Sequence, residues 1–150
     1  YGTQKGLMIS PAMWKKFFAP HLNTLADMAH KAGLKVFLHC DGGSRQIIPE
    51  FIELGIDILN PIQPQCVGMD PKELKNEYGD RLCFHGAIDT QKTLPFGTKE
   101  EVILEVKERI EVLGKGGGYI LAPVHTVEPD VPIENILAVY EAAREYGKYI

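Results

Sequence analysis

Three side chains that could bind a metal ion or act in catalysis follow two short apolar runs of the sequence. His39 and Asp41 come directly after residues 34–38, and His125 comes soon after residues 119–121. Residues two apart on an extended chain point to the same side, so the imidazole of His39 and the carboxylate of Asp41 would face one direction. Both groups bind divalent ions such as zinc, and a third ligand from another strand would complete a catalytic site with one open position. His125 is the candidate for that third ligand.

The spacing of His39 and Asp41 also permits a structural interpretation. In that case the imidazole would donate a hydrogen bond to a neighbouring carbonyl, and the carboxylate would cap the following helix. Because a His-x-Asp pair is a weak motif, spacing alone leaves both interpretations open.

Other polar side chains follow the two middle apolar runs, residues 56–59 and 81–84. The carboxyl ends of parallel strands form the functional face of α/β folds, because the loops there converge on one crevice. We therefore predict that these side chains contact a substrate beside His39, Asp41 and His125. The predicted contacts are Asn60, Gln63, His85 and Asp89.

Three of these contacts have alternative roles. Asn60 could bond the turn at Pro61 instead of facing a ligand. Asp89 is expected rather to hold the turn after Gly86 by accepting hydrogen bonds from backbone amides. His85 is expected in the wall of the pocket rather than in the chemistry.

The elements that must position these side chains recur in a fixed order: an amphipathic helix, a glycine, a short apolar strand and a polar loop. Helix starts are marked by Ser10-Pro11, Asp70-Pro71 and Thr98. Residues 34–38 are too continuously apolar for a strand with one wet face, which predicts a buried strand. The predicted strands are the four apolar runs given above. The predicted helices span residues 10–33 with a break near residue 20, 47–54, 70–79, 98–114 and 132–146.

Strands that alternate with helices predict an α/β fold with a parallel sheet covered by helices. Four such units could form a small open sheet or half of an eight-stranded barrel. An open sheet usually carries a glycine-rich phosphate loop after its first strand, whereas residues 39–42 read His-Cys-Asp-Gly. We therefore predict the carboxyl-terminal half of a (β/α)8 TIM barrel. Residues 1–150 would then be one partial domain whose amino-terminal half is missing.

The composition excludes several classes of protein. With 150 residues, 45% hydrophobic and 24% charged, the chain has enough apolar material for one core. The net charge of -4 gives no reason to expect nucleic acid or an anionic membrane as a partner, and no apolar run is long enough to cross a bilayer. Three cysteines without a Cys-x-x-Cys pair favour the reducing cytoplasm. The first residues contain no signal peptide, and we expect the chain to begin partway through a longer protein.

Several segments together resemble the uroporphyrinogen decarboxylase superfamily, and the resemblance extends over essentially the whole chain. That superfamily also contains methyltransferases that move a methyl group between a corrinoid and a thiol such as coenzyme M. The matching segments are residues 9–11 (ISP), 38–42 (LHCDG), 55–60 (GIDILN), 85–90 (HGAIDT), 117–123 (GGYILAP), 124–125 (VH) and 132–136 (PIENI).

The resemblance implies a particular set of ligands. The methyltransferase branch carries zinc on a His-x-Cys pair after one strand and on a second cysteine after the last strand. His39 matches that histidine, Asp41 stands at the first cysteine position and His125 at the second. The implied zinc site is therefore His-Asp-His, whose oxygen and nitrogen ligands are harder than thiolates. The decarboxylase branch also has a histidine near His125 but normally has nothing like His39.

These implications predict an enzyme that uses zinc and accepts a methyl group from a corrinoid carried by a partner protein. The acceptor would be a thiol or a related small molecule. One alternative is uroporphyrinogen decarboxylation, for which Arg45 would be the nearest basic contact to the acidic substrate. Another is a noncatalytic half barrel that pairs with a second copy or with the missing amino-terminal half, because its strand edges would otherwise be exposed.

Overall fold

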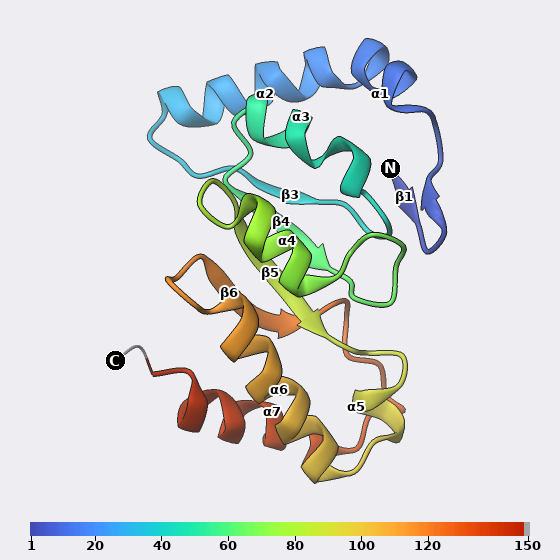
Figure 1. Ribbon diagram of the computed structural model, residues 1–150, viewed down its shortest axis with the longest axis vertical. Coiled ribbons are helices and arrows are strands. Elements are labelled where there is room, and N and C mark those ends of the chain that lie inside the picture. The colour runs from blue at the N-terminus through green and yellow to red at the C-terminus, as the bar shows by residue number, and fades with distance from the viewer. Residues whose placement is uncertain (149–150) are drawn as a thin grey trace.

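Four parallel strands form the sheet on which the rest of the molecule is built (Figure 1). The computed structural model describes residues 1–148. The sheet has the order β3-β4-β5-β6, so each unit adds its strand beside the one before it. A doubly wound sheet reverses its order partway, whereas a (β/α)8 barrel does not. The sheet therefore has the order of a partial barrel, as predicted. Its strands are Phe37–His39 (β3), Ile58–Ile62 (β4), Cys83–Ile88 (β5) and Tyr119–Pro123 (β6).

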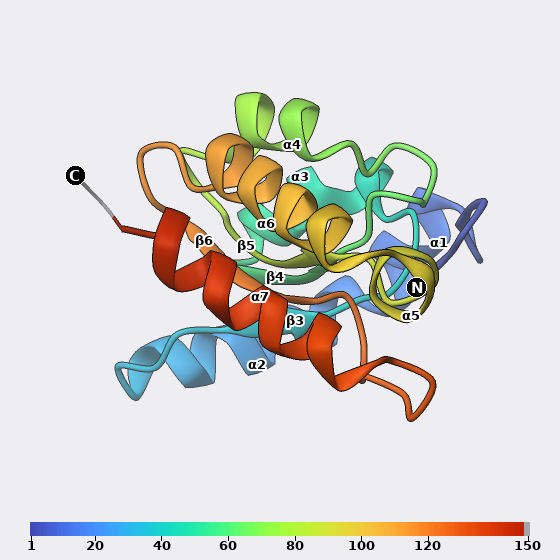
Figure 2. The same cartoon turned by 90° about the horizontal axis from the view of Figure 1, so that it is seen from below.

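Helices connect the strands and cover the sheet. They are α1 (Pro11–Phe17), α2 (Ala19–Lys31), α3 (Ile48–Glu53), α4 (Pro71–Tyr78), α5 (Thr93–Phe96), α6 (Lys99–Leu113) and α7 (Ile133–Tyr146), with a 3-10 turn η1 (Arg45–Ile47) before α3. Figure 2 shows α3, α4 and α6 in one layer on the same side of the sheet. Within residues 1–148 no helix is both long and apolar enough to span a membrane.

The predicted helix starts are confirmed by the hydrogen bonds that cap them. The side chains of Ser10 and Asp70 each accept a hydrogen bond from the backbone amide three residues further on. Thr98 and Glu101 form a reciprocal pair, in which each side chain accepts from the other residue's backbone N–H. The predicted break in the first helix falls at Phe18, between α1 and α2.

Two apolar clusters hold the elements together, and β5 contributes to both. Phe84 packs in the first cluster, which includes the fully buried Trp14 and Phe51 from α1 and α3. Ile88 packs in the second cluster with side chains of α6 and α7, such as Val106. β5, the strand that carries His85, is therefore anchored in both apolar clusters.

The prediction of a buried first strand over residues 34–38 is wrong. Only Phe37–His39 pair with β4, and Leu34 and Phe37 are 61% and 49% exposed. β3 is an edge strand of the described sheet, and the face that carries Phe37 and His39 is exposed whereas Leu38 is partly buried. An apolar run indicates that a strand forms, but it does not reveal the position of that strand in the sheet.

The two middle strands extend further than predicted. β4 reaches Ile62 and β5 reaches Ile88, so Asn60 and His85 lie within strands rather than after them. Their polar side chains are tolerated there because they bond each other across the sheet. Two of the polar residues that were predicted to follow the strands, Asn60 and His85, thus belong to the sheet.

Asp57, directly before β4, stabilises one end of the sheet, and Asn60 and His85 lie toward the other end. Asp57 accepts hydrogen bonds from Lys35 Nζ (2.7 Å), from the Val36 backbone N–H (2.8 Å) and from His30 Nε2 (2.8 Å). Burial alone would raise the pKa of Asp57, but these bonds outweigh it and lower the pKa to about 2. The ionised carboxylate therefore ties α2 and the segment before β3 to β4.

Replacing Asp57 with asparagine is expected to lower the free energy of unfolding at pH 7 by about 2 kcal/mol. The folded-state pKa lies below the unfolded value of about 3.9, so this stabilisation is present above pH 4 and is lost as the pH falls toward 2. Urea unfolding of both proteins at pH 7 and at pH 2.5 measures the difference. Asp80→Asn, at a carboxylate that is 77% exposed, is the matched control. A difference between wild type and Asp57→Asn that is equal at both pH values would contradict the assignment.

Candidate functional site

The side chains of His39 and Asp41 lie side by side at the carboxyl end of β3. His39 is the last residue of the strand, and its Nε2 lies 2.9 Å from Asp41 Oδ2. The two side chains are 55% and 47% exposed, so the pair faces an open surface. Asp41 does not provide a cap for the next helical turn, η1, which has no side-chain cap. The structure thus has the two side chains facing each other, as the spacing predicts.

Asn60 connects this pair to a second histidine. It lies opposite His39 in the β3–β4 register and is 9% exposed. Its Oδ1 is 2.5 Å from His39 Nδ1, and its Nδ2 is 2.7 Å from His85 Nδ1. The result is a continuous chain of hydrogen bonds from Asp41 through His39 and Asn60 to His85.

The amide of Asn60 gives the two imidazoles different tautomers. Its oxygen can only accept, so Nδ1 of His39 carries a hydrogen. Its nitrogen can only donate, so Nδ1 of His85 is unprotonated and the hydrogen of the neutral ring is on Nε2. The sequence suggested a turn or a ligand contact for Asn60, and in the structure its side chain bonds both imidazoles.

The two rings also differ in their affinity for a proton. The hydrogen bond with Asn60, followed by the hydrogen bond and charge of Asp41, raises the pKa of His39 despite partial burial. Burial lowers the pKa of His85, so this ring is neutral at pH 7. At His39 a metal ion would have to displace a proton held between Nε2 and the carboxylate.

His125 comes from the loop after β6 and lies next to His39. The two ring centroids are 6.5 Å apart, with 62° between the ring planes, and His125 is exposed. Imidazole, carboxylate and imidazole form a donor set that suits zinc. The three do not yet meet at one point: within residues 1–148 no three His, Cys, Asp or Glu side chains form a group that could hold a metal ion. The arrangement therefore provides a close two-ligand pair with a third donor beside it.

Residues 3–146 match the protein family described as uroporphyrinogen decarboxylase (URO-D). The chain belongs to the URO-D family. Among curated relatives, it is 23% identical over 147 residues to a uroporphyrinogen decarboxylase of Coxiella burnetii, covering 95% of this chain and 38% of the relative. It is 28% identical over 139 residues to a methylcobamide:CoM methyltransferase, MtaA, of Methanosarcina barkeri, covering 93% of this chain and 38% of the relative.

The fold is shared with a solved structure. A methyltransferase from Methanosarcina mazei superimposes with a TM-score of 0.78 at 24% sequence identity, over 98% of this chain and 41% of that one. The chain thus spans about two fifths of the length of these relatives. The relatives that the chain resembles thus include both decarboxylases and methyltransferases.

Two further predicted contacts have structural roles in this URO-D chain. Gln63 Oε1 accepts a hydrogen bond from the Gly42 backbone N–H (3.0 Å), which fixes the loop that carries Asp41. Asp89 is 5% exposed, and its Oδ1 accepts hydrogen bonds from the amides of the turn after β5, at 2.7 and 3.3 Å. Asp89 therefore holds the turn after β5, whereas Gly86, where the sequence predicted the turn, lies within the strand.

An amino-terminal hairpin supports the loop of Asp41 and was missed by the sequence reasoning. Its strands are Gly2–Thr3 (β1) and Gly6–Leu7 (β2), and Thr3 O accepts a hydrogen bond from Gly43 N–H at 2.8 Å. Gly42 has a φ of +83°, and a Cβ there would lie 2.6 Å from Thr3 O. The glycines at both contact points were the available signal, since glycine permits such a close approach of two backbones.

Arg45, the basic contact that the sequence offered for a decarboxylase, is paired with two glutamates. Its guanidinium bonds Glu73 Oε2 (2.8 Å) and also pairs with Glu77, both on α4. It further donates to Gly68 O at 3.3 Å. The sequence suggested Arg45 only because it follows His39 and Asp41 closely along the chain. In the structure its guanidinium forms ion pairs with two glutamates.

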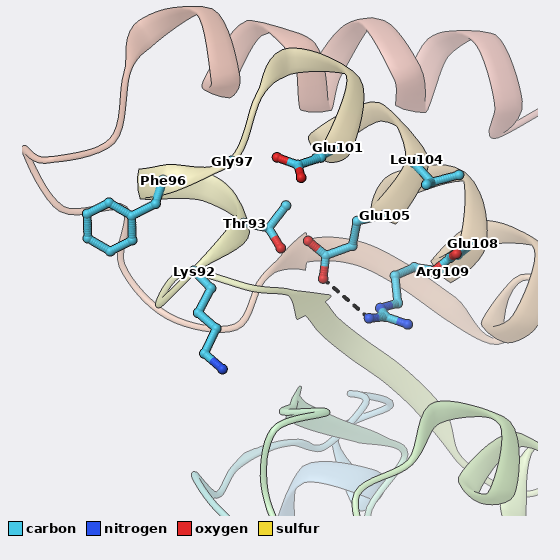
Figure 3. Close-up of a pocket in the computed structure, with 9 residues that line it drawn as sticks. All are labelled: Lys92, Thr93, Phe96, Gly97, Glu101, Leu104, Glu105, Glu108 and Arg109. Atoms are coloured by element: carbon cyan, nitrogen blue, oxygen red, sulfur yellow. Dashed lines mark hydrogen bonds and ion pairs between the residues drawn. The ribbon is translucent and has the colours of Figure 1, made fainter.

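A separate pocket of about 490 Å³ lies between α5 and α6 (Figure 3). Its lining includes Lys92, Thr93, Glu105 and Arg109, and none of the predicted site residues of the URO-D chain. The candidate site is instead the open surface at the carboxyl ends of the strands. This is where active sites of barrel enzymes are built.

Proposed function

We propose that this protein takes part in methyl transfer from a methylated corrinoid to a thiol, with zinc bound by His39, Asp41 and His125. The proposal rests on the His39–Asp41 pair at the carboxyl end of β3, in which Nε2 and Oδ2 are 2.9 Å apart. Similarity to a methylcobamide:CoM methyltransferase supports the same class of reaction. The corrinoid would be presented by a partner protein, and the thiol would be a small molecule.

In this reaction a sulfur–carbon bond forms as the cobalt–carbon bond breaks, and the electron pair of the broken bond stays on the cobalt. The thiol must first lose its proton, because the thiolate is the nucleophile. Bound zinc would supply the positive charge that lowers the pKa of the thiol. The protein's own part is to hold the ligands and to position the substrate.

Asn60 is the residue that prepares His39 for this role. Because Asn60 accepts from Nδ1–H, the ring has its lone pair on Nε2 once the proton shared with Asp41 has been displaced. Hydrogen bonds of this kind, made to the ring nitrogen that does not bind the metal, orient metal-binding histidines and strengthen them as ligands. His85 is neutral, and its Nε2–H is a donor that can contact the substrate.

Uroporphyrinogen decarboxylation is the second candidate, favoured by the similarity to the Coxiella enzyme. Its substrate carries several carboxylates and needs basic contacts. In this chain Arg45 is engaged by two glutamates, and the half-exposed Asp41 would repel an acidic substrate. The charges therefore favour methyl transfer.

Zinc binding tests the proposal directly. We expect the purified protein to bind one zinc ion per chain, measured by competition with a chromophoric chelator. Asp41→Asn and His125→Ala are each expected to weaken binding by at least roughly 10-fold, because each removes a ligand. His21→Ala, at an exposed histidine of α2, is the matched control and should bind as the wild type does.

Failure of the wild type to bind zinc, or equal losses in the control and in His125→Ala, would overturn the metal site. Consumption of uroporphyrinogen without added metal would support decarboxylation in its place. A protein that neither binds zinc nor turns over either substrate would favour the noncatalytic alternative.

A further inference from the structure

The backbone of β5 takes an unusual course directly after His85. Gly86 has a φ of +108° and Ala87 a φ of +74°. Within residues 1–148, Ala87 is the one residue other than glycine with a positive φ. A residue with a Cβ is strained in this region by about 1 kcal/mol or more, so surrounding contacts must hold it there.

Two side chains hold the carbonyl groups of this left-handed step. The phenol of Tyr119, the first residue of β6, donates to Gly86 O at 2.8 Å. The guanidinium of Arg109 on α6 donates through Nε to Ala87 O at 3.1 Å. Ala87 is fully buried, so its carbonyl depends on hydrogen-bond donors from within the protein, and Arg109 is one of them.

Arg109 is itself oriented by a buried carboxylate one helical turn earlier. Glu105 Oε1 is 3.3 Å from Arg109 Nη2 and 3.3 Å from the backbone nitrogen of Asp89, both of which donate to it. Figure 3 shows Glu105 and Arg109 side by side on α6, next to the end of the strand. The carboxylate thus fixes both the guanidinium and the residue that follows β5.

The strained step lies close against β4, the strand that carries Asn60. A Cβ on Gly86 would be 3.1 Å from Pro61 Cβ, and the β4–β5 register shifts between Leu59 and Ile62. Relaxation of φ at Ala87 would therefore change how β5 meets β4 beside the hydrogen bond between Asn60 Nδ2 and His85 Nδ1.

We propose that Arg109, oriented by Glu105, and Tyr119 are positioning residues that hold the Gly86-Ala87 step and thereby keep His85 bonded to Asn60. Neither touches the site itself: they act through the backbone of β5. The contribution of this arrangement to catalysis rests on the proposed function, whereas its effect on His85 is measurable without any substrate.

Nitrogen-15 NMR of the histidine rings tests the proposal. In the wild type at pH 7.5 we expect His85 to be a single tautomer with Nδ1 unprotonated. In Arg109→Met, which keeps the aliphatic stem and removes the donors, the Nδ1 resonance should shift toward the average of two tautomers. Tyr119→Phe, a milder change that removes one hydroxyl, should give a smaller shift in the same direction. Lys107→Met is the matched control on α6, because Lys107 faces Glu111 at 3.9 Å, and it should give no shift.

The result that overturns the proposal is loss of stability in both variants with the His85 resonances unchanged, since this is what a purely structural role produces. If Arg109→Met does not fold, Tyr119→Phe decides the question by the same measurement. A shifted His85 in a protein that shows no methyl transfer would leave the positioning role intact and refute the proposed function. If methyl transfer occurs, kcat in Arg109→Met should fall while KM for the thiol stays near the wild-type value.

Discussion

Replacing His39 with alanine is expected to reduce corrinoid-to-thiol methyl transfer by more than roughly 100-fold. It removes a proposed zinc ligand, and losing a residue that only orients such a ligand already costs roughly 10- to 100-fold. The substitution removes the ring that faces Asp41 at 2.9 Å and is held by Asn60 at 2.5 Å. It also leaves the amide oxygen of the largely buried Asn60 without its partner. The loss of methylcobalamin absorbance in the presence of a thiol measures the rate.

The control for this prediction is His21→Ala, which removes an exposed imidazole from α2 and should retain full activity. Circular dichroism of both variants should match the wild type, because His39 is half exposed and contributes little to the core. A His39→Ala protein that keeps a tenth or more of the activity would exclude a direct role for this ring.

Replacing Phe84 with alanine is expected to lower the free energy of unfolding by about 3–5 kcal/mol. Phe84 is fully buried in β5, and its backbone pairs with both β4 and β6. The cavity would form next to His85, in the strand that contributes to both apolar clusters. Because whole domains are stabilised by only about 5–15 kcal/mol, a loss of this size removes much of the total.

Chemical denaturation of Phe84→Ala should be compared with that of Phe96→Ala. Phe96 is 78% exposed, so its removal should change the stability by no more than about 0.5 kcal/mol. A loss below about 1 kcal/mol in Phe84→Ala would mean that the surrounding side chains close the cavity, and that β5 is less rigidly held than its burial indicates.

Local signals predicted the helices well. Ser10, Asp70 and Thr98 each cap the helix that they were expected to start. A cap depends on residues only three positions apart, so it can be read from the sequence. The four-residue helix α5 and the two-residue strands of the hairpin are too short to produce a periodic pattern, and the sequence reasoning missed them.

The candidate site was predictable only in part, for a related reason. The alternation of side chains along a strand was enough to expect His39 and Asp41 on one side. The role of Asn60 depends on the β3–β4 register, which sets it opposite His39, and no local pattern specifies that register. The roles of Arg109 and Tyr119 depend on φ angles in β5 and on contacts from α6 and β6, which are equally nonlocal.

The single amide between the two imidazoles has a chemical consequence for any protein with this arrangement. A carboxylate at position 60 would accept from both rings and would make both of them donors through Nδ1. The amide instead makes one ring a donor and the other an acceptor. Asn60→Asp, a change of a single functional group, would therefore place a hydrogen on Nδ1 of both His39 and His85 while preserving the shape of the side chain.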